Sequence, residues 1–393
     1  MNTSKIGFMV AGLGLAVNPA LAAEELGLDA SSVYAAELRA DASVRGSLGA
    51  DATEYAPKIF GYIQARYNLN TSDGYTGTTE DIYNGFEMGH TRLGVKGQIH
   101  SRVKYFFQGE FSSSGGGFTL LDGFATIDLN DDVQVLVGQT FLPYSRGFYT
   151  SPAYSLAVEK SVTTAFFPGN RAQGVMLTYN GDRFRGRVMF SDGDSTANTA
   201  YTSSSEADYA ITGRVDWLAA GDWDQFNDFT SFRGSDFGAL VGAGVHWQDG
   251  GNTGGTTDMS LLAATADVGL EFDGANLFGA VHWQRMETTA GDYDDFGVVL
   301  QGGVFVSDIV ELFARYDAIF ADSDRPLNGD FNTVTAGLNY YLIPESHAAK
   351  LTFDVQYFLD DQASSPVSAN TTLGVLGSTD EQYNLRAQLQ VMF

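Results

Sequence analysis

The chain has 393 residues, a formal net charge of -26 and no cysteine. The acidic balance excludes nucleic-acid binding, because no cluster of Lys and Arg could offset the repulsion from phosphates. The absence of cysteine excludes disulfides and thiolate metal sites. Glycine is abundant at 46 residues and proline scarce at 8, and helical periodicity is almost absent after about residue 57, which disfavours an ordinary soluble protein.

The N-terminus has the pattern of a secretory signal peptide. Lys5 precedes the apolar run Ile6–Val17, and Ala20-Leu21-Ala22 has the small-x-small form of a cleavage site. This predicts a signal peptide over residues 1–22. The alternative, a short membrane anchor, is disfavoured because a spanning helix needs about 20 apolar residues.

Residues 23–56 differ in composition from the rest of the chain. They are rich in alanine, with leucine and valine spaced among charged residues. This spacing predicts one or two short amphipathic helices in a periplasmic segment. A linker and a segment that binds the cell wall or oligomerises both stay open.

From Lys58 onward the pattern alternates with a period of two, as successive side chains of a strand do. In the first strand, for example, Gln64, Arg66 and Asn68 share one face. Transmembrane strands need about 9–11 residues, and most of the segments fit. Sixteen strands are predicted: 58–69, 86–98, 102–112, 119–129, 132–140, 173–180, 183–192, 207–219, 236–248, 258–272, 276–287, 293–306, 309–320, 331–342, 348–359 and 382–393.

Long and short connections alternate between these strands, with one exception at Ala220–Ser235. Short turns at one end and long loops at the other are typical of outer-membrane barrels. The long set is 70–85, 113–118, 141–172, 193–206, 249–257, 288–292, 321–330 and 360–381. The pattern therefore predicts an all-β, sixteen-stranded antiparallel transmembrane β-barrel over 57–393, preceded by a short helical segment.

The two faces of each strand differ as a barrel in lipid requires. One face is apolar, for example Val241, Val245 and Trp247, and we expect it to contact lipid. The last strand is amphipathic and ends on Phe393, which looks like an assembly signal of bacterial outer-membrane proteins. His246 and His282 fall on the inner face, where we interpret them as polar wall residues and not as metal ligands.

The longest loop, 141–172, is basic and aromatic in an otherwise acidic chain. It carries Arg146, Lys160 and Arg171 against one acid, Glu159. A structureless connection of this length is uncommon unless it is functional. We expect it to fold into the lumen and narrow a pore that favours anions.

Basic residues also collect on the inner face of the strands, where rings of Arg and Lys favour anions in a pore. Acids such as Asp122 and Asp317 share that face, so structural ion pairs are the alternative for many of these cations. The inward set is Arg66, Arg92, Lys96, Lys104, Arg185, Arg187, Arg214, Arg315 and Arg386.

Three segments, Leu121–Phe124, Val137–Arg146 and Pro168–Leu177, resemble motifs of the phosphate-selective porin O and P family. Phe86–Gly97 resembles that family's second strand. The resemblance implies a homotrimer of sixteen-stranded porins with an inward third external loop and a basic anion path. Carried over by motif, Arg92, Arg146 and Arg171 would line it.

The resemblance implies an outer-membrane porin for passive diffusion of small hydrophilic solutes or inorganic anions, with a mild preference for anions such as phosphate. The family often has lysine where this chain has Phe141, so a non-selective or cation-tolerant general porin stays open. A barrel enzyme or adhesin is the alternative of another class. No G-x-S-x-G, P-loop or H-E-x-x-H motif occurs, and we predict no catalytic residue, cofactor or metal.

Overall fold

The computed structural model describes residues 56–73, 82–111, 116–250, 259–377 and 380–393. The signal peptide predicted over 1–22 and the helices predicted within 23–56 lie outside these ranges, apart from the last residue of the second segment. Both stay predictions. No helix in the described ranges is long and apolar enough to cross a bilayer.

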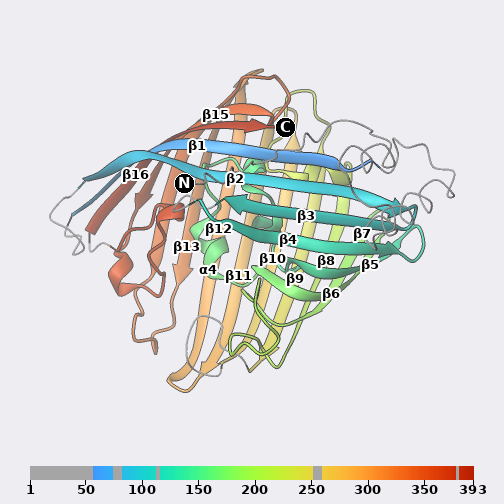
Figure 1. The fold of residues 1–393 in the computed structure, drawn as a ribbon. Coiled ribbons are helices and arrows are strands. Elements are labelled where there is room, and N and C mark those ends of the chain that lie inside the picture. Colours follow the sequence, from blue (N-terminus) through green and yellow to red (C-terminus); the bar gives the residue numbers. More distant parts are fainter. Residues whose placement is uncertain (1–55, 74–81, 112–115, 251–258, 378–379) are drawn as a thin grey trace, which may run out of the picture. The chain divides into compact units, whose positions relative to one another are not determined.

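The described strands form one closed antiparallel barrel, in which each strand pairs with its sequence neighbours and β1 pairs with β16 (Figure 1). The predicted number, direction and order of the strands are confirmed. The strands are β1 (Lys58–Asp73), β2 (Ile82–His100), β3 (Val103–Phe111), β4 (Phe118–Asp128), β5 (Val133–Phe141), β6 (Arg171–Asn180), β7 (Phe184–Ser191), β8 (Tyr209–Ala220), β9 (Gly238–Asp249), β10 (Met259–Phe272), β11 (Ala275–Thr288), β12 (Gly291–Ser307), β13 (Val310–Phe320), β14 (Phe331–Tyr341), β15 (Ala349–Phe358) and β16 (Asp380–Met392).

The last residue of the chain helps to close the barrel. The amide of Gly61 donates to the carbonyl oxygen of Phe393 at 3.0 Å, and the amide of Phe393 donates back to Gly61 at 3.0 Å. Next to this pair, Tyr62 is in register with Met392. Closure leaves no free strand edge, which would otherwise template pairing with another chain.

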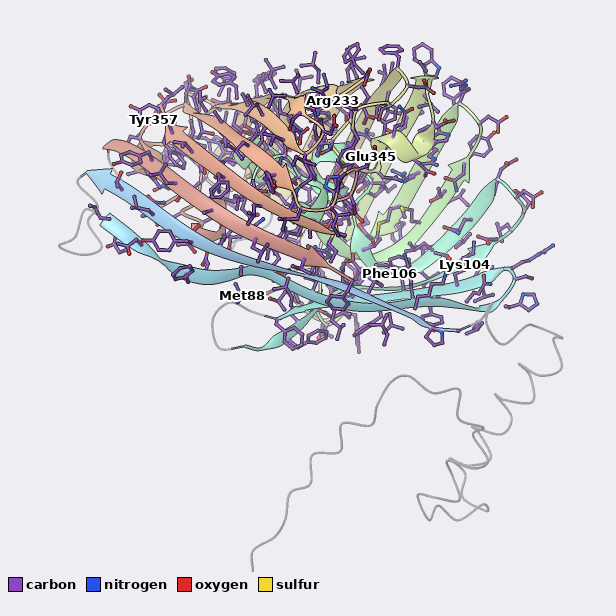
Figure 2. All side chains as sticks on the ribbon, turned by 90° about the horizontal axis from the view of Figure 1, so that it is seen from above. Met88, Lys104, Phe106, Arg233, Glu345 and Tyr357 are labelled. Carbon is purple, nitrogen blue, oxygen red and sulfur yellow. The ribbon has the colours of Figure 1, made fainter. Side chains whose placement is uncertain are left out.

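Side-chain exposure alternates along the strands as the sequence predicts. On β9, Val241, Val245 and Trp247 point outward and are exposed, whereas His246 between them is fully buried. The side chains that project from the outer surface, such as that of Tyr357, consist mostly of carbon (Figure 2). A side chain that is apolar and exposed on a closed barrel faces lipid, and the inner wall is polar.

One predicted loop is wrong. Residues 288–292 were expected to form a long connection, but β11 ends at Thr288 and β12 begins at Gly291. The acidic run in this region suggested a loop, yet the guanidinium of Arg285 bonds to Asp292 and Asp294 across the hairpin, at 3.1 Å each. These cross-strand ion pairs let the ladder continue through polar residues.

The exceptional turn, 221–237, is the longest connection at the end of the barrel where the others are short. It contains a 3-10 helix, η2 (Trp223–Asn227), which begins at a reciprocal capping box between Asp222 and Gln225. The other short helical elements of the described residues are α3 (Arg146–Tyr149), η1 (Pro152–Tyr154), α4 (Val162–Phe166), η3 (Gln362–Ser364) and η4 (Thr371–Leu373).

If the exposed apolar side chains face lipid, the loss of stability on introducing a charge should depend on the depth of the substituted residue in the membrane. Leu300 is central in β12 and 55% exposed, and Leu342 follows the end of β14 and is 50% exposed. Leu300→Arg should lower the free energy of unfolding by about 2–4 kcal/mol and Leu342→Arg by about 0–1 kcal/mol. Urea unfolding in lipid vesicles measures both. Equal costs at the two positions would contradict the lipid-facing assignment.

Candidate functional site

The long loop between β5 and β6 runs from 142 to 170, and it is not structureless. It carries α3, η1 and α4, and most of its side chains are buried. The hydroxyl of Ser161 accepts the amide of Thr164 at 2.9 Å and so caps α4. At the C-terminal end of the loop, the amides of Gly169 and Asn170 donate to the carboxylate of Asp194 at 2.9 and 2.8 Å. Gly169 has a positive φ of 138°, which favours glycine there.

Inward-facing side chains of the barrel wall donate hydrogen bonds to the backbone carbonyls of this loop. Buried carbonyls need such partners because no regular strand or helix supplies them. The donors come from β1, β8, β13, β14, β15 and β16, and Gln64 of β1 donates to Pro152 at 3.5 Å. The other pairs are Arg214 to Tyr144 at 3.0 Å, Gln390 to Ala153 at 3.1 Å, Lys350 to Ser155 at 2.8 Å, Asn339 to Leu156 at 3.0 Å and Arg315 to Glu159 at 2.8 Å.

Two wall carboxylates accept bonds from the same loop. Asp354 accepts the amide of Val158 at 2.9 Å, and Asp317 accepts the hydroxyl of Ser161. Each carboxylate is itself held by an arginine of the wall. The pairs are Arg386 with Asp354, bidentate at 2.7 and 2.8 Å, and Arg315 with Asp317 at 2.8 Å. Such charge-assisted pairs orient the carboxylates toward the loop amides.

Glu159 is the loop's own charged anchor. Its carboxylate lies 2.6 Å from Arg66 Nη1 and 3.2 Å from His90 Nε2, and its side chain is 2% exposed. Burial alone would raise the pKa of Glu159, but nearby His90 and Arg66 lower it to about 2. The loop is therefore tied by an ionised carboxylate to strands β1 and β2, which lie four and five strands around the barrel from β13.

Arg146 joins the loop to the turn 221–237 from the other end of the barrel. It is 2% exposed, and its guanidinium donates to the carbonyls of Phe226 at 3.3 Å and Asp228 at 2.5 Å. Three aromatic rings lie within 4.8 to 5.6 Å of its Cζ: Phe226, Phe229 and Phe278. Arg146 thus fills a closed aromatic cage. It is not among the residues that line the cavity described next.

A cavity of about 750 Å³ lies between the loop and the wall formed by β1 to β7 and β16. Its only acid among the described lining residues is Asp122, which binds Arg171 through both oxygens at 3.0 and 2.9 Å. The cations that line it are Arg92, Lys96, Arg171 and Arg187. The cavity therefore carries a formal excess of positive charge inside an acidic protein.

Lys160 lies next to this cavity without lining it, and its Nζ is 5.5 Å from the ring centroid of the lining residue Phe141. Its ammonium donates to the carbonyl of Phe148 at 3.5 Å and lies 4.3 Å from that ring's centroid. Burial, together with the nearby cations Arg92 and Arg171, lowers the pKa of Lys160 to about 7. The charge of this lysine therefore changes near neutral pH.

The structure divides the twelve sequence-predicted residues into three groups. It brings Arg92, Lys96, Arg171 and Arg187 together at the cavity, with Lys160 next to them. Lys104 pairs with Asp128 at 2.8 Å near the short-turn end, and Arg185 stacks 4.1 Å over the ring of Trp223. Each of the remaining cations helps to hold the loop, by bonding to it, by joining it to the turn 221–237, or by orienting a wall carboxylate that binds it. They are Arg66, Arg146, Arg214, Arg315 and Arg386.

Sequence reasoning missed several residues that the site uses. Lys350, Asn339 and Gln390 hold loop carbonyls, and Phe60, Phe106 and Phe124 line the cavity. All six take the inward parity of their strands, which the sequence pattern does show. Parity alone places a side chain inside the barrel, but it says nothing of the loop that meets it there.

Comparison with known proteins gives one family and several similar folds. The model of the family described as phosphate-selective porin O and P matches residues 58–304. Comparison with curated proteins finds no significant match. Among solved structures, the chain is similar to an anion-selective porin from Comamonas acidovorans, with a TM-score of 0.62 and 15% identity, covering 86% of this chain and 100% of that one.

Two further structures share the fold at low identity. OprB of Pseudomonas putida at high pH has a TM-score of 0.58 and 12% identity, covering 90% of this chain and 97% of that one. Outer-membrane expressed OmpT of Vibrio cholerae has a TM-score of 0.56 and 10% identity, covering 88% of this chain and 99% of that one.

The anchoring of the loop yields a prediction. Glu159→Gln should leave the buried guanidinium of Arg66 with Glu87, 2.6 Å from its Nε, as its remaining charge partner. The cost should therefore lie below the about 3–5 kcal/mol of a buried charge that loses its only partner. We expect lower stability in urea and a larger, noisier single-channel conductance, because the loop moves from its place.

Glu287→Gln is the matched control, since Glu287 is an exposed partner of Arg285 at 3.2 Å on the outer rim. If the single-channel conductance of both variants equals that of the wild type and shows no added noise, Glu159 does not hold the loop.

Proposed function

The chain belongs to the phosphate-selective porin O and P family, whose model covers more than half of its length, and on that premise we propose how it selects solutes. As a member it is a porin of the bacterial outer membrane, a transport channel and not an enzyme. We propose that small hydrophilic solutes diffuse through the lumen beside the loop 142–170, with a mild preference for anions.

The cavity between the loop and the wall carries this proposal. Four cations and one carboxylate line it, and low-dielectric walls focus the resulting field on the passing solute. The net charge of -26 does not oppose this, because exposed charges farther away than about 10 Å are screened by salt. Rings of Arg and Lys favour anions in other pores.

The loop acts as the constriction in this proposal. Its backbone is bonded mainly to β8 and to β13 through β16, with one further bond to β1. The buried cluster of Leu156, Phe229, Phe278 and Phe313 fills the side of the lumen next to β11 through β13. Solutes are then confined to the side lined by β1 to β7, where the cavity lies.

A non-selective or cation-tolerant porin is the second candidate. Asp122 binds Arg171 through both oxygens, and Glu110 binds Arg92 at 3.0 Å. If these pairs neutralise both arginines, Lys96 and Arg187 remain to attract anions. Arg187 itself lies 3.7 Å from a carboxylate oxygen of Asp216, so the preference is small.

We also propose that the protein is a homotrimer. The support is the family resemblance together with the similar OmpT of Vibrio cholerae, one structure of which is described as a trimer form.

Charge removal at the cavity tests the selectivity. In a KCl gradient across a planar bilayer, the reversal potential of the wild type should show chloride crossing more readily than potassium. The double variant Lys96→Gln/Arg187→Gln should lower the chloride-to-potassium permeability ratio by at least about fivefold, since a single charge about 4 Å away contributes about 1 kcal/mol even in water.

Arg285→Gln is the control, because Arg285 is half-exposed on the outer rim and does not line the cavity. A wild type that favours potassium would contradict the anion preference. An unchanged ratio in the double variant would place the filter elsewhere.

The preference should also depend on pH through Lys160. Its pKa is lowered to about 7, so it is charged below that pH and neutral above it. Arg92, Arg171, Glu110 and Glu159 are the charged groups that act on it. The chloride preference should therefore fall as pH rises from 6 to 8, and Lys160→Met should remove this dependence. An equal pH slope in that variant would exclude Lys160 as its source.

A further inference from the structure

The inner wall of the cavity carries an aromatic ladder that charge selection does not need. Phe60, Phe106 and Phe124, on β1, β3 and β4, point inward and are only half-buried. The ring centroids of Phe60 and Phe106 are 5.2 Å apart, and those of Phe106 and Phe124 are 5.1 Å apart and stacked. Phe106 is labelled in Figure 2. Inner walls of aqueous barrels are polar, so three half-buried rings in a row are unusual.

Glycines beside the ladder leave room for the rings. Gly94 is in register with Phe60, and a Cβ there would clash with the Phe60 ring. Gly138 is in register with Phe124, and a Cβ there would lie 2.9 Å from the Cβ of Phe124. Both rings therefore have space beside the neighbouring strand, and they present a continuous apolar surface to the cavity.

Each cation of the cavity lies over an aromatic ring of the same cavity. Lys96 Nζ is 5.3 Å from the centroid of Phe60, and Arg171 Cζ is 3.7 Å from that of Phe141. Arg92 lies 5.5 Å from Tyr62, and Arg187 lies 5.2 Å from Tyr149. Cation–π contact holds each positive group against a ring. The cavity thus offers positive charge and aromatic surface side by side.

An inorganic anion would use the positive charge and leave the rings in contact with water. An anion that also carries an aromatic ring would use both, because its carboxylate can bond to Lys96 or an arginine while its ring stacks on the ladder. The cavity volume of about 750 Å³ lies within the range of small-molecule sites, about 300–1,000 Å³.

We propose that this cavity is a binding site for small aromatic carboxylates, which occupy it on their way through the channel. The inference rests on the proposed anion-preferring pore and names the class of anion that the pore retains longest.

Block of the chloride current in planar bilayers tests the inference, with benzoate, cyclohexanecarboxylate, acetate and phosphate as probes at equal ionic strength. Benzoate should bind about tenfold more tightly than acetate, because stacking of one ring on aromatic side chains raises affinity by about fivefold to about 150-fold. Cyclohexanecarboxylate should lie between them. Equal affinities of benzoate and acetate, equal affinities of benzoate and cyclohexanecarboxylate, or tightest binding of phosphate would each overturn the proposal.

Two variants separate the ladder from the lipid face. Phe106→Leu should bring the affinity for benzoate close to that for acetate. Phe107→Leu is the matched control, because Phe107 is the next residue and points outward, 43% exposed. Retention of tight benzoate binding in Phe106→Leu would overturn the role of the ladder.

The two proposals fail in different ways. A channel that favours potassium when no organic anion is present refutes the proposed anion preference. A channel that favours chloride but binds benzoate no better than acetate refutes only the aromatic site. The probe series on the wild type decides the second question even if a variant does not fold.

Discussion

The central constraint on this protein is that the backbone of a long loop lies inside a barrel, where its polar groups need partners. Six wall side chains donate to its carbonyls, and two wall carboxylates accept from its amides or hydroxyls. An unpaired buried backbone group would cost about 1–3 kcal/mol. The composition of the wall on that side follows from this requirement.

The same constraint separates two kinds of charge in the lumen. Arg214, Arg315 and Arg386 are buried, each pairs with an aspartate, and each holds the loop directly or through that aspartate. Arg92, Lys96 and Arg187 line the open cavity, where Arg92 is bound by Glu110 at 3.0 Å and Arg187 lies 3.7 Å from Asp216. Inward cations are therefore not equivalent, and only those away from the loop's attachment sites face a passing solute. Removing a charge from the first kind changes folding before it changes selectivity, because the partner carboxylate is left buried.

The loop and the turn 221–237 enter from opposite ends and meet inside the barrel. The amide of Phe229 donates to the carbonyl of Tyr154 at 3.3 Å, and Arg146 bonds to two carbonyls of the turn. This contact explains why one turn at the short-turn end is long. It also explains the position of Arg146, which the sequence suggested for the anion path and which the structure shows in an aromatic cage.

The sequence by itself determined the sixteen strands, their order and their two faces, because alternation is a local property that each strand carries in its own residues. The run Gln388 to Phe393 shows its inward and outward sides without reference to any other segment. The acidic residues led to a wrong prediction of a long loop at 288–292, where the strands continue because Arg285 pairs with the acids across the hairpin. The tertiary structure decided which inward side chains meet the loop and which line the cavity. Lys350 and Ser155, for example, are 195 residues apart, and no periodicity within either segment encodes a contact between them.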